Sequence, residues 1–115
     1  MRQGEIWLIN LEPTIGAEIK KTRPAVIVND NALGKLPLKI IVPITDWKEG
    51  YRIAPWMVNI PPDNLNNLMK ESSLDCFQIR SISEKRFIKR IGVVKMSILD
   101  DIKEALMKVL SIEIN

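Results

Sequence analysis

Hydrophobic residues recur in short runs through the first three quarters of the chain and with a helical period only near its end. The short runs are rich in β-branched and aromatic side chains, which is typical of strands. They predict strands over Glu5–Asn10, Ala25–Asn29, Lys39–Thr45, Trp56–Ile60 and Leu74–Ile79, with a further strand over Phe87–Val94. From Ser97 onwards the apolar positions lie on one face of a helix, with Ser97 as its predicted N-cap.

Turn residues separate the predicted strands. Gly, Pro, Asn and Asp cluster over residues 12–16, 29–37 and 61–67, so we expect antiparallel strands joined by short connections. Five or six such strands and one helix predict a mainly β fold, either a small, strongly curved β-barrel or a two-sheet sandwich, with the C-terminal helix covering an open face. At 115 residues we expect one domain over 1–115.

Composition narrows the possible functions. The net charge of +3 gives a mild bias toward polyanionic partners. The chain has one cysteine, Cys76, and no histidine, so we expect neither a disulfide nor a zinc site, and no metal or other cofactor. Its apolar runs are far shorter than the roughly 20 residues of a membrane helix, and the N-terminus lacks a signal pattern. We therefore expect a cytoplasmic protein that does not associate with membranes.

Three sequence blocks carry a family resemblance. The first combines Gly4-Glu5-Ile6-Trp7, Glu12-Pro13-Thr14, Gly16-Ala17-Glu18 and Thr22-Arg23-Pro24-Ala25-Val26-Ile27-Val28; the others are Pro43-Ile44-Thr45 and Gln78-Ile79-Arg80-Ser81-Ile82. Together they resemble the MazF/PemK family of toxin endoribonucleases, the RNA-cleaving halves of bacterial toxin-antitoxin pairs. The resemblance implies a small SH3-like barrel of antiparallel strands, closed by the C-terminal helix, and a symmetric homodimer.

Without histidine, the chemistry must come from other side chains. The guanidinium of Arg23 offers a fork of donors that matches phosphate oxygens, although an Arg at a strand entrance is more often simply solvated. Thr45 closes a predicted strand, where a hydroxyl commonly bonds the local backbone. The resemblance implies that Arg23 is the principal catalytic residue and that Thr45 donates to a phosphate oxygen, while the 2′-hydroxyl of the RNA itself attacks.

The general base stays open at this stage. Glu18 lies in the same loop as Arg23 and is a candidate to orient the guanidinium or accept the 2′-hydroxyl proton, or it is an exposed loop charge. Some family members have a histidine where this chain has Ala17, and an acid where it has Phe77. Asp75 replaces that acid only if the strand around it is regular.

The remaining candidates are RNA-binding residues. Polar and basic side chains suit phosphates, and aromatic ones stack on unpaired bases; the set is Lys20, Lys21, Trp47, Arg52, Gln78, Arg80 and Arg86. Gln78 and Arg80 have an alternative role in structural contacts, and Trp47 and Arg52 have an alternative role as anchors for a protein partner. The basic run from Lys85 to Arg90 is by default a solvated face.

Two functions remain in contention. One is a metal-independent endoribonuclease that cleaves single-stranded RNA and is neutralised by an acidic antitoxin protein. The alternative is a non-enzymatic toxin that binds and poisons DNA gyrase, because such toxins share a similar barrel. We favour the nuclease, since RNA cleavage requires Arg23 and Thr45 to converge on one phosphate.

Overall fold

The computed structural model describes residues 1–13, 15–18 and 21–113. Its regular elements are seven strands and one α-helix, joined in places by short 3-10 turns. The strands are β1 (Glu5–Asn10), β2 (Thr22–Ile27), β3 (Leu38–Asp46), β4 (Met57–Ile60), β5 (Ser72–Asp75), β6 (Arg80–Ser83) and β7 (Phe87–Val93), and the helix is α1 (Met96–Val109). The 3-10 turns are η1 (Asn31–Leu33), η2 (Glu49–Ile53), η3 (Cys76–Gln78) and η4 (Glu84–Arg86).

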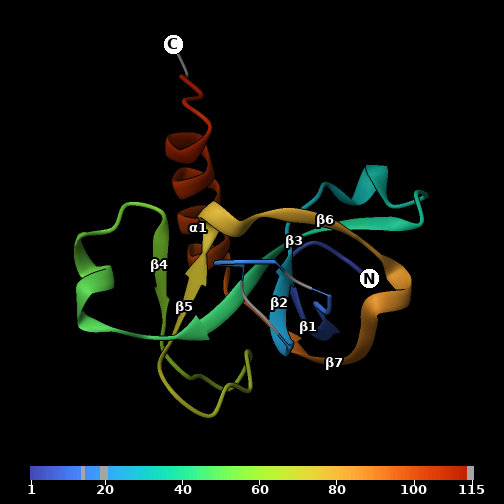
Figure 1. Ribbon diagram of the computed structural model, residues 1–115, viewed down its shortest axis with the longest axis horizontal. Coiled ribbons are helices and arrows are strands. Elements are labelled where there is room, and N and C mark those ends of the chain that lie inside the picture. The colour runs from blue at the N-terminus through green and yellow to red at the C-terminus, as the bar shows by residue number, and fades with distance from the viewer. Residues whose placement is uncertain (14, 19–20, 114–115) are drawn as a thin grey trace.

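The strands form one antiparallel sheet in the order β4-β5-β3-β2-β1-β7, and β6 pairs with the first half of β3. The nine-residue strand β3 crosses the molecule and joins the part built from β1, β2 and β7 to the smaller part built from β4 and β5 (Figure 1). The predicted mainly antiparallel β fold with a C-terminal helix is confirmed. The sheet does not close into a full barrel, because β4 and β7 end it on opposite sides.

Two hydrophobic clusters lie on opposite faces of β3, as the alternation of side chains along a strand requires. Val42 and Ile44 belong to the larger cluster, which includes Leu99 and Ile102 of α1. Ile41 belongs to the smaller cluster, with residues of β1, β2 and β6. The helix therefore covers one face of the sheet with its predicted apolar stripe. Among the described residues, no helix is long and apolar enough to cross a membrane.

Several local predictions were wrong. The segment Leu74–Ile79 is a strand only as far as Asp75, because the Asp75 carboxylate accepts a hydrogen bond from the Phe77 N–H and caps η3. Strand β6 was not predicted, since only Ile82 among its four residues is apolar. The helix begins at Met96, so Ser97 lies inside it, and Lys95 at the N-cap makes no capping side-chain bond.

Candidate active site

Arg23 and Thr45 come together at one end of strands β2 and β3. The antiparallel register pairs Ala25 with Pro43, and continuing it by two residues places Arg23 across from Thr45. Both residues line a cleft of about 250 Å³. The residue before each proline is held extended, which keeps Arg23 in the strand conformation that this arrangement needs. Two donors from separate sequence blocks thus border one cavity.

The far wall of this first cleft comes from the turn between β4 and β5, through Asn67, Leu68, Met69 and Lys70. Asn67 adopts a left-handed conformation (φ 54°) and its amide donates to the carbonyl of Ile91 at 2.9 Å, which fixes the turn against β7. Lys70 Nζ lies 3.0 Å from Oδ1 of Asp46, the residue that directly follows Thr45. Lys70 was missed by sequence reasoning, because an isolated lysine in a turn carries no signal of the strand it will face.

A second cleft of about 320 Å³ brings together Glu18, Gln78 and Arg80. It is lined by Leu11, Glu18, Pro43, Phe77, Gln78, Ile79 and Arg80. Glu18 Oε2 lies 3.9 Å from Arg80 Nη1, and Glu18 Oε1 accepts a bond from the Ile15 N–H at 2.6 Å. Pro43 and Thr45 are two residues apart on β3 and therefore share a face of that strand. Glu18, Gln78 and Arg80 accordingly lie on the Thr45 side of β3.

Asp75 lines neither of these two clefts and makes structural contacts. It is only 6% exposed, and its two carboxylate oxygens accept from the Phe77 N–H and from Gln78 Nε2, each at 3.1 Å. The condition under which Asp75 would replace the acid missing at Phe77, a regular strand, is not met, because residues 76–78 form the turn η3. Glu18 is the candidate carboxylate that lines the second cleft.

The cysteine next to Asp75 is unreactive. Burial, and then the neighbouring Asp75 charge, raise the pKa of Cys76 to about 12. A thiol with this pKa stays protonated at neutral pH, and the thiolate is the nucleophilic form. Cys76 therefore does not supply a nucleophile for the reaction.

Of the other predicted RNA-binding residues, those that the structure describes line neither of these two clefts. Trp47 stacks edge-on against Tyr51 with ring centroids 6.1 Å apart. Arg52 is exposed, lies 3.1 Å from Glu49 and borders a groove along α1. Arg86 contacts the backbone at the end of β1. Lys21 is exposed at the entry to β2, and Lys20 lies outside the described residues.

Comparison with known proteins decides the family. The sequence model of the family of PemK-like, MazF-like toxins of type II toxin-antitoxin systems matches residues 2–110. The chain belongs to this family. Among curated members, it is 30% identical to the endoribonuclease MazF9 of Mycobacterium tuberculosis over 92% of each chain. It is 32% identical to the endoribonuclease PemK of Escherichia coli, over 96% of this chain and 83% of PemK.

Solved structures of these toxins have the same fold. A crystal structure of MazF from Deinococcus radiodurans superposes with a TM-score of 0.81 at 22% identity, covering 97% of both chains. A mycobacterial endoribonuclease in complex with its cognate antitoxin superposes with a TM-score of 0.80 at 18% identity, covering 100% of this chain and 99% of the other. Both superpositions cover nearly the whole chain, so these structures share its fold.

Proposed function

We propose that residues 1–115 form the single domain of a type II toxin that cleaves single-stranded RNA without a metal ion. The observation that carries the proposal is the shared cleft of Arg23 and Thr45, because two donors of this kind suit one phosphate group. The curated relatives are named endoribonucleases, and family membership adds to the argument. Poisoning of DNA gyrase gives no reason for both donors to border one cavity, so that alternative is not favoured.

In the proposed reaction the 2′-oxygen of one nucleotide attacks the adjacent phosphorus. The bond from phosphorus to the 5′-oxygen breaks and its electron pair leaves with that oxygen, which takes a proton from water. The products are a 2′,3′-cyclic phosphate and a 5′-hydroxyl. Arg23 stabilises the charge that develops on the phosphate oxygens, and the Thr45 hydroxyl donates to one of them. The guanidinium offers hydrogen-bond donors and no acceptor, so its role is electrostatic.

Glu18 is the proposed acceptor of the 2′-hydroxyl proton. It lines the second cleft, on the side of β3 that also carries Thr45, and it belongs to the segment that leads into Arg23. Arg80, 3.9 Å away, holds the carboxylate in place. Gln78 and Arg80 border the same cleft and are proposed to contact the RNA beside the cut phosphate.

Partners follow from the surface. We expect a homodimer, because Trp56 and Phe77 stack edge-on, 6.1 Å apart, and are 38% and 67% exposed. The protein is expected to act in the cytoplasm, where RNA is available. An acidic antitoxin segment would compete with RNA for the cations around both clefts, and its apolar side chains would cover exposed aromatic residues.

The direct test uses purified protein and a mixed-sequence single-stranded RNA in excess EDTA. We expect the RNA to be cut and a DNA of the same sequence to stay intact, because DNA lacks the 2′-hydroxyl. Loss of cutting in EDTA with recovery on adding Mg²⁺ would contradict metal independence. Intact RNA under both conditions would contradict the nuclease.

A further inference from the structure

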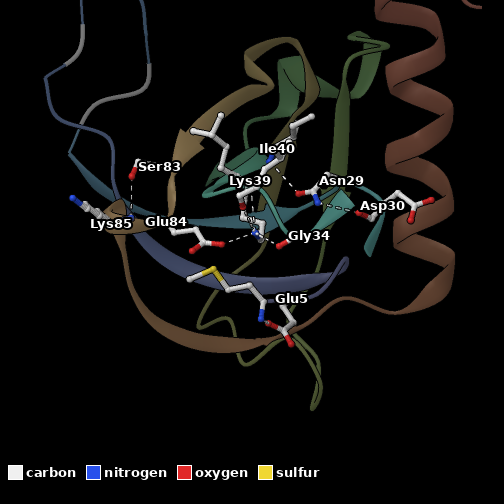
Figure 2. A network of polar contacts seen from close by, with 12 residues as sticks. Glu5, Asn29, Asp30, Gly34, Lys39, Ile40, Ser83, Glu84 and Lys85 are labelled. Atoms are coloured by element: carbon white, nitrogen blue, oxygen red, sulfur yellow. Dashed lines mark hydrogen bonds and ion pairs between the residues drawn. The ribbon is translucent and has the colours of Figure 1, made fainter. Parts of the chain in front are cut away.

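The turn η4 between β6 and β7 is anchored on one side by an ion pair between buried Lys39 and partly exposed Glu84. Lys39 is only 3% exposed, and its Nζ lies 2.6 Å from Glu84 Oε1 (Figure 2). The same ammonium donates to the carbonyls of Gly34 and Leu36, and the Glu84 N–H donates to the Pro37 carbonyl at 3.1 Å. These contacts tie the start of η4 to the segment that precedes β3.

The start of the turn is fixed locally as well. Ser83 Oγ accepts a bond from the Lys85 N–H at 3.2 Å and caps η4 (Figure 2). Together with the Lys39–Glu84 ion pair, this cap leaves the backbone around Arg86 little freedom. The position from which the Arg86 side chain extends is therefore set by contacts that involve neither cleft.

On its other side, η4 holds the segment that leads to the active site. Arg86 Nη1 donates to the carbonyl of Asn10 at 3.1 Å and also to the carbonyl of Glu12. The carboxylate of Glu12 in turn accepts from the Lys21 N–H at 2.8 Å, and the Leu11 N–H donates to the Lys21 carbonyl at 3.2 Å. The Arg86 guanidinium thus binds the backbone where the chain leaves β1. Through Glu12 it is linked to Lys21, which lies two residues before Arg23.

We propose that Arg86 is a positioning residue rather than a residue that binds RNA. It fixes Arg23 and Glu18 by holding the stem that residues 10–12 form with residue 21. The proposal rests on the proposed function. Its physical basis is that a displacement of about 1 Å at a reacting group costs about 100-fold in rate. Removing the guanidinium frees two carbonyls and lets the stem move relative to the fixed strands, while the number of phosphate-binding charges stays the same.

The test compares Arg86→Met with the wild-type protein and with Lys85→Met, which removes the same charge one residue away. Hydrogen exchange needs no nuclease activity, so it separates this proposal from the proposed function. We expect the Leu11 and Lys21 amides to exchange faster in Arg86→Met and at the wild-type rate in Lys85→Met. Unchanged exchange in Arg86→Met would overturn the proposal, whether or not the protein cuts RNA.

Kinetics provide the second readout. We expect kcat to fall about 100-fold in Arg86→Met with KM unchanged. Binding of a 2′-O-methyl RNA, which cannot be cut, should keep its wild-type salt dependence, whereas loss of a phosphate contact would lower the slope of log affinity against log salt by about 1. A lowered slope with unchanged kcat would overturn the proposal. If wild-type protein does not cut RNA, the proposed function fails and exchange alone decides the role of Arg86.

A second variant covers the case in which Arg86→Met does not fold. Arg86→Lys keeps the positive charge but replaces the planar fork by a compact ammonium. We expect it to bind 2′-O-methyl RNA with wild-type salt dependence and to lose part of the protection at Leu11 and Lys21. Wild-type protection in Arg86→Lys would then contradict the requirement for the guanidinium.

Discussion

At the scale of single residues, the proposed site stabilises negative charge with hydrogen-bond donors and a positive guanidinium. It has no histidine to transfer protons. The guanidinium of Arg23 presents several donors in one plane, while Thr45 adds a single hydroxyl from the neighbouring strand. Both contributions grow as charge develops on the phosphate oxygens. They therefore act mainly on the transition state and should appear in kcat.

Arg23→Ala and Thr45→Ala should fold normally and cut RNA slowly. Removing one donor from a transition-state site lowers kcat by about 100- to 1000-fold. Initial rates and thermal unfolding would be measured side by side, with Arg2→Ala as a control that removes an exposed arginine near the N-terminus. Wild-type cutting by folded Arg23→Ala would contradict a catalytic role for this arginine.

The candidate residues differ in how far sequence alone could predict their positions. Arg23 directly precedes Pro24 and Thr45 lies two residues after Pro43, each in an apolar strand, so local patterns place both at strand ends. The proximity of Glu18 to Arg80 depends on residues 62 positions apart in the chain, and the contact of Arg86 with the Asn10 carbonyl spans 76 positions. Such contacts are set by strand pairing across the whole sheet, and no local pattern encodes them.

At the scale of elements, β3 positions both clefts and β7 supports the turn that walls the first one. Strand β1 matches its predicted bounds because its apolar residues lie between polar Glu5 and Asn10. Strand β7 carries Gly92, where a Cβ atom would lie 2.4 Å from the Leu65 carbonyl oxygen and 2.8 Å from that of Asn66. Asn66 is 1% exposed and its amide donates to the Pro61 carbonyl at 2.9 Å, so this turn cannot easily move away.

Gly92→Ala should therefore destabilise the fold. Forcing a methyl group into a packed site usually costs about 1–3 kcal/mol in the free energy of unfolding, and here the obstacle is backbone. Gly50→Ala is the matched control, because an added Cβ there meets no atom within 4 Å. Denaturant unfolding of the two variants should show a loss of stability only for Gly92→Ala, and equal midpoints would contradict the packing described for β7.

At the scale of the whole molecule, a small excess of positive charge coexists with exposed aromatic side chains. The chain carries a net charge of +3, and Trp56 and Phe77 form an exposed edge-on pair beside the end of α1, where Val109 also contributes to the surface. Charge suits RNA or an acidic antitoxin, whereas the apolar area suits a second copy of the chain. These two kinds of surface support the expectation of a dimer that binds polyanions.

The dimer is tested by mass in solution. At micromolar concentration we expect twice the mass of one chain for the wild type, and a shift toward the monomer for Phe77→Asp, because a carboxylate cannot be buried there without a partner. Ile88→Asp is the control, since Ile88 is 55% exposed on β7. A wild-type monomer, or equal dissociation of both variants, would show that the aromatic pair is not the interface.

The central claim is that the RNA supplies its own nucleophile while the protein supplies donors. The most direct measurement uses a synthetic RNA with a mapped cleavage site and a copy in which the nucleotide before the cut phosphate alone lacks its 2′-hydroxyl. The account predicts that the unmodified RNA yields a 2′,3′-cyclic phosphate and a 5′-hydroxyl, and that the substituted copy is not cut at that position. Cutting of the substituted copy at the wild-type rate would contradict it.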